Sequence, residues 1–164
     1  MIYLEKIKNN IFKKENIYFI ILTIIIIYLD RISKEKVIEN FNESVFYFND
    51  YVNIDLIWNN GIGFGLLSTN SSLIYNLVTL IIGLVIVFIT CIFCISEKTD
   101  KFIYSIIIGG ALGNFSDRII YKAVPDFIDL HFDNFHWFTF NVADIFITVG
   151  IILYLIKGYF TEKT

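Results

Sequence analysis

The chain has 164 residues, of which 56% are hydrophobic, and its mean hydropathy is +0.66. Soluble domains carry about 45–50% apolar residues, so this composition favours a membrane protein over a water-soluble one. The formal net charge is −3 and no basic stripe is evident, so we expect no nucleic-acid partner. The length suits a single membrane-embedded domain over residues 1–164.

Four apolar stretches approach the length of about 18 residues that spans a membrane. They cover approximately residues 17–38, 73–95, 102–121 and 137–156. Lysines cluster before the first stretch, between the second and third, and after the fourth. The positive-inside rule therefore predicts that both termini are cytoplasmic and that segments 39–72 and 122–136 face outward.

The first stretch resembles the apolar part of a signal peptide, because lysines precede it. Asp30 and Arg31 follow it, however, where small residues would form a cleavage site, so we expect an uncleaved span. Asp30 and Lys34 are four residues apart and share a helix face in the favoured order, acidic before basic. They form either a helix-end ion pair or the rim of a polar cavity.

Residues 44–67 differ in kind from the apolar stretches. Aromatic, β-prone residues come first, and residues 52–58 alternate apolar with polar side chains, which indicates a strand. Asn59 and Gly61 then begin a glycine-rich turn. We expect a small outward β-element on the membrane surface, where aromatic side chains are favoured.

The third stretch combines small and polar residues. Ser105, Gly109 and Gly113 are spaced by four, which allows close packing of helices in lipid. A polar group follows them at positions that share one helical face. Its members are Asn114, Asp117, Arg118 and Tyr121.

Pro125 separates the third stretch from the fourth. Proline disfavours a helix there, so we expect Asp126 on a turn or loop. The fourth stretch begins at Trp137, and Asn141, Asp144 and Thr148 share one of its faces. Asp144 would then lie about 10 Å below the start of the span, at 1.5 Å per residue.

Carboxylates are the best candidates for chemistry in this chain. His131 and His136 lack a third ligand, so no metal site is expected, and no serine stands in a nucleophile context. Two adjacent carboxyl groups that share a proton can activate water, because their mutual repulsion separates their pKa values. Asp144 is one candidate. The residue pattern leaves its partner open among Asp117, Asp126 and Asp129, although a cation beside Asp117 would suit a supporting role.

Five segments resemble, in order, the motifs of lipoprotein signal peptidase (signal peptidase II), a family of bacterial membrane aspartic peptidases. Residues 29–34 resemble L-D-x-x-T-K with serine for threonine, and 59–65 resemble N-x-G-x-x-F-[SG]. Residues 109–118 resemble G-G-A-L-G-N-x-x-D-R, and 140–144 resemble F-N-x-A-D. Residues 124–129 resemble V-V-D-F-I-D, departing at Pro125.

The resemblance implies that Asp126 and Asp144 form a catalytic dyad. It implies an all-α membrane protein with four transmembrane helices and a small extracytoplasmic β-cradle between spans one and two. Supporting residues are expected to line or brace the site, with Asp117 added from its position. They are Asp30, Lys34, Asn59, Gly61, Asn114, Asp117, Arg118 and Asn141.

The implied substrate is a prolipoprotein that already carries diacylglycerol, cleaved just before its lipidated cysteine. We expect a monomer in the bacterial cytoplasmic membrane, surrounded by lipid, with its active site towards the outer face and with no metal or organic cofactor. The alternative from another class is a small transporter with Asp30, Asp117 and Asp144 as a relay. That alternative needs polar groups on the inner half of the spans, where few are found. A non-catalytic relative would require a broken dyad.

Overall fold

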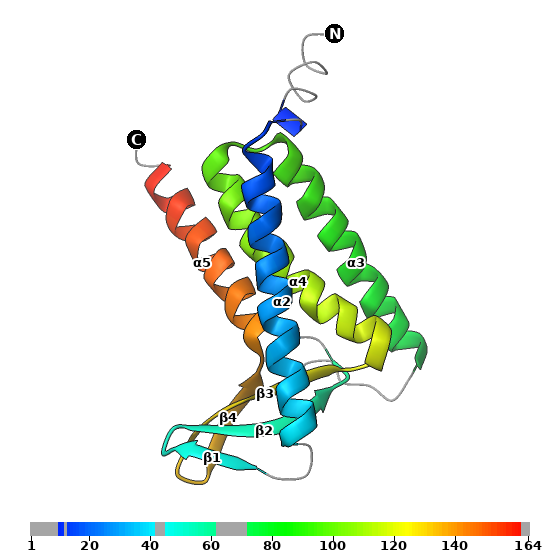
Figure 1. Ribbon diagram of the computed structural model, residues 1–164, viewed down its shortest axis with the longest axis vertical. Coiled ribbons are helices and arrows are strands. Elements are labelled where there is room, and N and C mark those ends of the chain that lie inside the picture. Colours follow the sequence, from blue (N-terminus) through cyan, green and yellow to red (C-terminus); the bar gives the residue numbers. More distant parts are fainter. Residues whose placement is uncertain (1–9, 12, 42–44, 62–71, 162–164) are drawn as a thin grey trace.

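The computed structural model describes residues 10–11, 13–41, 45–61 and 72–161. This part contains four long helices and one four-stranded sheet. The elements in chain order are α2 (Asn16–Asn40), β1 (Phe46–Asn49), β2 (Val52–Asn59), α3 (Ser72–Ile95), α4 (Lys98–Tyr121), β3 (Val124–Phe132), β4 (Phe135–Phe140) and α5 (Val142–Thr161). The helices lie side by side with the sheet at one end, and the start of α2 and the end of α5 lie at the opposite end (Figure 1).

Helix α4 is the centre of the bundle and packs against α2, α3 and α5. Glycines make these contacts close, as their spacing predicted. A Cβ atom at Gly109 would lie 2.9 Å from Ile26 of α2, and one at Gly110 would lie 2.5 Å from the carbonyl oxygen of Ala143 on α5. The neighbouring helices therefore pack directly against the α4 backbone.

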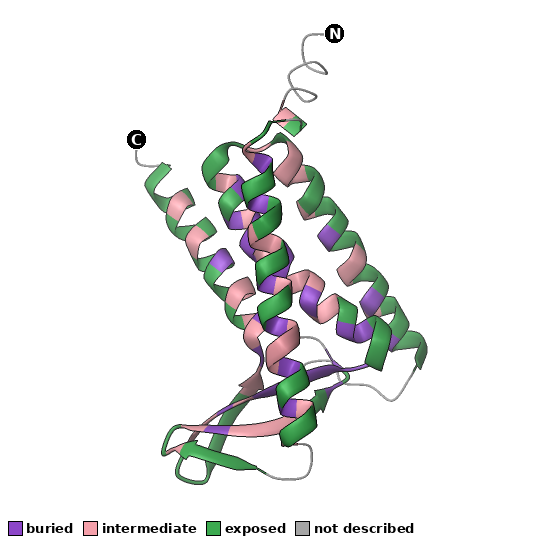
Figure 2. Cartoon of the chain, viewed as in Figure 1, coloured by how far each residue is buried: buried purple, intermediate pink, exposed green. Residues whose placement is uncertain are grey.

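Helices α2, α3 and α5 are long and apolar enough to cross a membrane, whereas α4 does not meet that criterion among the described residues. The central position of α4 explains the difference. Its polar residues Lys101, Asp117 and Arg118 are buried against other helices and so do not need to face lipid. Figure 2 shows the reverse for α3, whose surface is mostly exposed, with large apolar side chains such as Leu84 and Phe88.

The sheet is antiparallel throughout, in the order β1-β2-β3-β4. Half of it comes from the segment after α2, as expected, although position 44 and the glycine-rich residues 62–67 lie outside the described residues. The other half, β3 and β4, comes from the segment between α4 and α5. The expectation that Asp126 lies on a turn or loop was therefore wrong, and the β-cradle comes only in part from the segment between the first two spans.

Pro125 misled the sequence interpretation because it lies in β3 and not in a turn. It pairs with Trp58 of β2, while β4 joins β3 at Ile128. At position 125 the strand therefore has a neighbour on one side, and proline is tolerated at such strand starts and edges. Asp126 is consequently held in a paired strand.

The fourth apolar stretch also divides differently from the expectation. Residues 135–140 form β4, in line with the strand preference of aromatic residues, and α5 begins at Val142. Asp144 therefore lies in the first turn of α5, next to the sheet, and not about 10 Å inside the span as 1.5 Å per residue from Trp137 suggested.

Candidate active site

Asp126 and Asp144 reach one cavity from two different elements. Asp126 is the third residue of β3 and is buried, and Asp144 is partly buried in the first turn of α5. Both side chains line a cavity of about 330 Å³. Strand β3 and helix α5 thus bring together two carboxylates that are eighteen positions apart in the chain.

Asn141 connects the two carboxylates. Its side-chain Nδ2 donates to Asp126 Oδ1 at 2.6 Å, and its backbone N–H donates to Asp144 Oδ2 at 3.2 Å. In return, the backbone N–H of Asp144 donates to Asn141 Oδ1 at 3.1 Å. This reciprocal pattern is a capping box, with Asn141 as the N-cap of α5 and Asp144 three residues later.

Asn59 holds the second oxygen of Asp126. Its Nδ2 donates to Asp126 Oδ2 at 2.8 Å, while its Oδ1 accepts the backbone N–H of Gly61 at 2.8 Å. Burial raises the pKa of Asp126 from 3.8 to about 6, and the charge of Asp144 also raises it, whereas the two asparagine donors oppose the shift. The Asp126 carboxyl group can therefore hold a proton near neutral pH.

Asn114 holds the second carboxylate from α4. Its Nδ2 donates to Asp144 Oδ1 at 2.8 Å, and its Oδ1 accepts from Lys34 Nζ at 2.8 Å. Because the lysine can only donate, it fixes which end of the Asn114 amide faces Asp144. Lys34 thereby orients a group that contacts the carboxylate pair.

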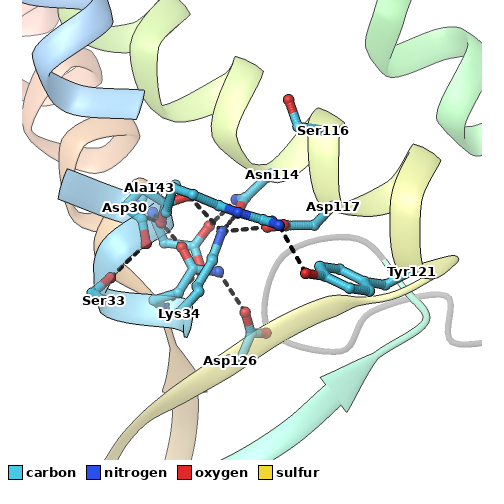
Figure 3. Close-up of polar contacts among 12 residues, drawn as sticks. Asp30, Ser33, Lys34, Asn114, Ser116, Asp117, Tyr121, Asp126 and Ala143 are labelled. Atoms are coloured by element: carbon cyan, nitrogen blue, oxygen red, sulfur yellow. Dashed lines mark hydrogen bonds and ion pairs between the residues drawn. The ribbon is translucent and has the colours of Figure 1, made fainter. Parts of the chain in front are cut away.

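Lys34 is fully buried between two further carboxylates. Its Nζ lies 2.7 Å from Asp30 Oδ2 and 2.6 Å from Asp117 Oδ2. Asp30 Oδ1 also accepts the backbone N–H of Ala143 at 2.9 Å, which ties α2 to the start of α5. The expected pair of Asp30 and Lys34 is thus part of an interhelical network (Figure 3).

The cations beside Asp117 come from α2 and not from Arg118, its neighbour on α4. Lys34 and Arg31 bind Asp117, the latter through Nη1 at 3.1 Å, and Arg31 also reaches Tyr121 Oη at 2.8 Å. Arg118, although adjacent in sequence, donates to the carbonyl oxygen of Gly61. The expected common face of α4 therefore divides into one part that meets α2 and another that meets the residues after β2.

Arg118 is buried at the cavity wall with spare donor capacity. Its Nη1 has no hydrogen-bond partner within the described residues. The guanidinium carbon lies 5.9 Å from the ring centre of Tyr75 on α3, close enough for a cation–π contact. A polar group entering the cavity would meet this donor.

Asp129, an alternative partner for Asp144, has a different neighbour. Its Oδ2 lies 2.7 Å from Nδ1 of His136, across the β3–β4 pair. Residues 126 and 129 are three apart in a strand, so their side chains point to opposite faces of the sheet. Among the described residues, no group of three histidine, cysteine or acidic side chains is arranged to hold a metal ion.

The cavity continues from its polar end along apolar helix surfaces. Ile82 of α3 and Ile147 and Ile151 of α5 form walls beyond the carboxylates, together with Thr148, which the helical spacing had placed on the face of Asp144. The cavity therefore presents proton-exchanging groups at the sheet and apolar side chains towards the interior of the bundle. It suits a ligand with a polar reacting centre and an apolar extension.

Sequence reasoning missed two contributors to the site, Arg31 and the backbone of Ala143. Arg31 donates to Asp117 and also to the hydroxyl of Tyr121, and the backbone N–H of Ala143 donates to Asp30. The N-x-x-D pattern at 141–144 was a readable signal for a helix start, because it matches a capping box. The pairing of Arg31 with Asp117 had no comparable local signal.

Comparison with known proteins gives consistent matches over most of the chain. The family model described as Signal peptidase (SPase) II matches residues 22–160. A lipoprotein signal peptidase of Pelagibacter ubique (strain HTCC1062) is 45% identical over 154 residues, covering 91% of this chain and 93% of the relative. Those of Blochmanniella pennsylvanica (strain BPEN) and Francisella tularensis subsp. novicida (strain U112) are 44% and 35% identical, covering 93% and 94% of this chain and 94% and 98% of the relatives.

Two solved structures share the fold. One is described as a bacterial membrane enzyme determined by the in meso method at 2.3 Å resolution, with a TM-score of 0.71, 27% identity and coverage of 90% of both chains. The other, described in the same words at 1.9 Å resolution, has a TM-score of 0.67 and 28% identity, covering 85% of this chain and 91% of that one.

Proposed function

Because this chain belongs to the signal peptidase II family of bacterial membrane aspartic peptidases, we propose that Asp126 and Asp144 are its catalytic dyad. Membership makes the protein a lipoprotein signal peptidase, so its substrate is a prolipoprotein. We propose further that the substrate already carries diacylglycerol. Cleavage would occur just before the lipidated cysteine, at the outer face of the membrane.

The proposed reaction uses one ionised and one protonated carboxyl group. Asp144 lies at the N-terminus of α5, where the helix dipole and the backbone N–H of Asn141 favour a negative charge. Asp126, with its pKa raised to about 6 by burial, holds the proton. Asp144 would take a proton from the attacking water, and Asp126 would donate to the carbonyl oxygen as it becomes an oxyanion. Proton transfer to the leaving amine completes the hydrolysis.

The remaining site residues would act by orientation. Asn59, Asn114 and Asn141 donate to the carboxylate oxygens and would hold them in reactive geometry. The spare Nη1 of Arg118 would donate a hydrogen bond to a backbone carbonyl oxygen of the substrate. Asp30, Lys34, Asp117 and Gly61 would brace these groups through the contacts described above. The apolar walls of the cavity would receive the lipid-bearing part of the substrate.

We infer that α4 also spans the membrane, which gives four spans in one domain. It has 24 residues, about 36 Å at 1.5 Å per residue, and is surrounded by three helices. The sheet would lie at the outer interface, where its exposed aromatic side chains are favoured. Both termini would then be cytoplasmic, and we propose that a monomer is active because one chain supplies both carboxyl groups.

The strongest support for the proposal is the position of Asn141, whose side-chain amide donates to Asp126 while its backbone N–H donates to Asp144. The test is cleavage of a purified lipid-modified prolipoprotein by Asp126→Asn and Asp144→Asn variants. Both variants should fold and both should lose activity by at least about a thousandfold, since each removes one half of the proton exchange.

Asp129→Asn is the matched control, because it changes the same residue type on the same strand but on the opposite face. It should retain most of the activity. Substantial turnover by Asp126→Asn together with inactivity of Asp129→Asn or Asp117→Asn would assign the second carboxyl group to one of those residues and contradict the proposal.

A further inference from the structure

A second cavity, of about 540 Å³, lies between α3 and α4. On α4 it is lined by Leu112, Phe115 and Ile119. The first cavity is lined on α4 by Ala111, Asn114 and Arg118, each of which directly precedes one of these three residues. By helical geometry the two cavities therefore lie on either side of the contact between α3 and α4, and the second is a separate groove.

This groove is apolar along most of its length. Leu80, Leu84 and Val87 of α3 contribute to it and are each more than half exposed, so they border an open groove. Gly83 deepens it, because a Cβ atom there would come within 3.2 Å of the Phe115 ring. In a membrane, such a surface faces lipid chains.

The end of the groove near the sheet is polar. Asn76 and Lys122 line it there, and both are exposed. Lys122 follows α4 in a left-handed conformation with φ of 58°, and within the described residues it makes no ion pair or hydrogen bond. It is also the only lysine or arginine in the two segments expected to face outward, 39–72 and 122–136, which carry seven acidic residues. Those residues are Glu39, Glu43, Asp50, Asp55, Asp126, Asp129 and Asp133.

We propose that this groove binds one anionic glycerophospholipid, with an acyl chain along α3 and α4 and its phosphate beside Lys122. The dimensions agree with one leaflet. From Asn76 to Val87 the helix rises about 17 Å at 1.5 Å per residue, close to half of a hydrocarbon core of about 30 Å. The charge pattern selects the headgroup, because the exposed acidic residues of the outward segments, such as Glu39, Asp50 and Asp133, repel an anion, whereas Lys122 attracts it.

The proposal rests on the membrane placement proposed above and not on the peptidase chemistry. The test is native mass spectrometry of the purified full chain in detergent, titrated with dioleoylphosphatidylglycerol or dioleoylphosphatidylcholine. The wild type should retain one phosphatidylglycerol molecule and prefer it to phosphatidylcholine. Lys122→Gln should weaken phosphatidylglycerol binding by about fivefold, the size expected for one lysine near an anionic lipid.

Two further variants separate the parts of the site. Gly83→Leu should weaken the binding of both lipids, because its side chain fills the groove while the edge of the Phe115 ring gives way. Lys36→Gln, which removes an exposed lysine from the sheet end of α2, is the charge-matched control and should bind like the wild type. Unchanged thermal unfolding temperatures would show that the variants are folded.

Equal binding of the two lipids by the wild type, or equal weakening by Lys36→Gln and Lys122→Gln, would overturn the proposal. Loss of a dimer in Gly83→Leu with lipid binding unchanged would do the same, since a second copy of the chain would then be the occupant. Asp144→Asn should bind lipid like the wild type. The outcome is therefore independent of whether the dyad is correct.

Discussion

Asn141 and Asp144 cap the same helix reciprocally, and through this contact the start of α5 also holds Asp126. Asn141→Ser separates the two roles, because serine can cap the helix but is too short to reach Asp126. Asn141→Ala removes both. We predict that kcat falls by roughly a hundredfold in both variants, with little change in KM.

Thermal unfolding completes this comparison. Asn141→Ala should also lose about 1 kcal/mol of stability through the missing cap, whereas Asn141→Ser should not. A fall in kcat in Asn141→Ala alone would mean that the helix cap, and not the hydrogen bond to Asp126, explains the effect.

The pKa of Asp126 predicts a pH dependence of stability. Its value near 6 lies above the unfolded value of 3.8, so the neutral form is favoured in the folded state. The stabilisation of the folded state that results from this shift is complete below pH 3.8 and is lost as the pH rises through 6. The difference between the folded and unfolded pKa values corresponds to about 3 kcal/mol in the free energy of unfolding. Relative to the wild type, Asp126→Asn should gain stability between pH 4 and pH 7, measured by thermal unfolding; a constant difference between the two proteins over that range would contradict the shift.

Replacing Lys34 is expected to destabilise the folded protein strongly. Lys34→Met leaves Asp30 and Asp117 buried with less compensation, which should cost about 3–5 kcal/mol in the free energy of unfolding. Arg31→Gln is the control, because Arg31 is one-third exposed and its ion pair should contribute less than about 1 kcal/mol. Similar losses in these two variants would show that burial of the ion pair is unimportant.

A double variant then separates stability from positioning. Asp30→Asn with Lys34→Met removes one charge of each sign and leaves Asp117 paired with Arg31. It should recover much of the stability but keep a low kcat, because Asn114 has lost the donor that orients it. Recovery of both quantities would limit Lys34 to a structural role.

Gly113 is predicted to tolerate no side chain. A Cβ atom there would lie 2.5 Å from Asp30 Oδ2, the oxygen that binds Lys34. Gly113→Ala should therefore destabilise the protein by roughly 1–3 kcal/mol, as overpacking does. Gly158→Ala meets nothing within 4 Å and serves as the control. Equal unfolding temperatures for the two variants would contradict the close approach.

The sequence was most informative where a signal is local. Runs of apolar residues located α2 and α3 to within two residues. The four-residue spacing of Gly109 and Gly113 predicted close helix packing, although not that α2 is the partner. The pattern of charges also identified Asp30 with Lys34 as a polar site. These features depend on neighbours along one helix, which a sequence displays directly.

Features that depend on pairing between distant segments were harder to predict. Pro125 suggested a loop, because its tolerance in β3 depends on where β4 begins to pair. The aromatic residues 135–140 suggested the start of a span, because an apolar run does not by itself distinguish a strand from a helix. The contact of Arg31 with Asp117 also joins two distant segments, so the sequence did not predict it.

The most direct test of the dyad is a double-mutant cycle on kcat with Asp126→Asn, Asp144→Asn and the double variant, using lipid-modified prolipoprotein. Carboxyl groups that share one proton act as a unit, so the double variant should lose no more activity than either single one. Losses that multiply in the double variant, or a single variant that still turns over at a rate near the wild type, would contradict a shared catalytic role.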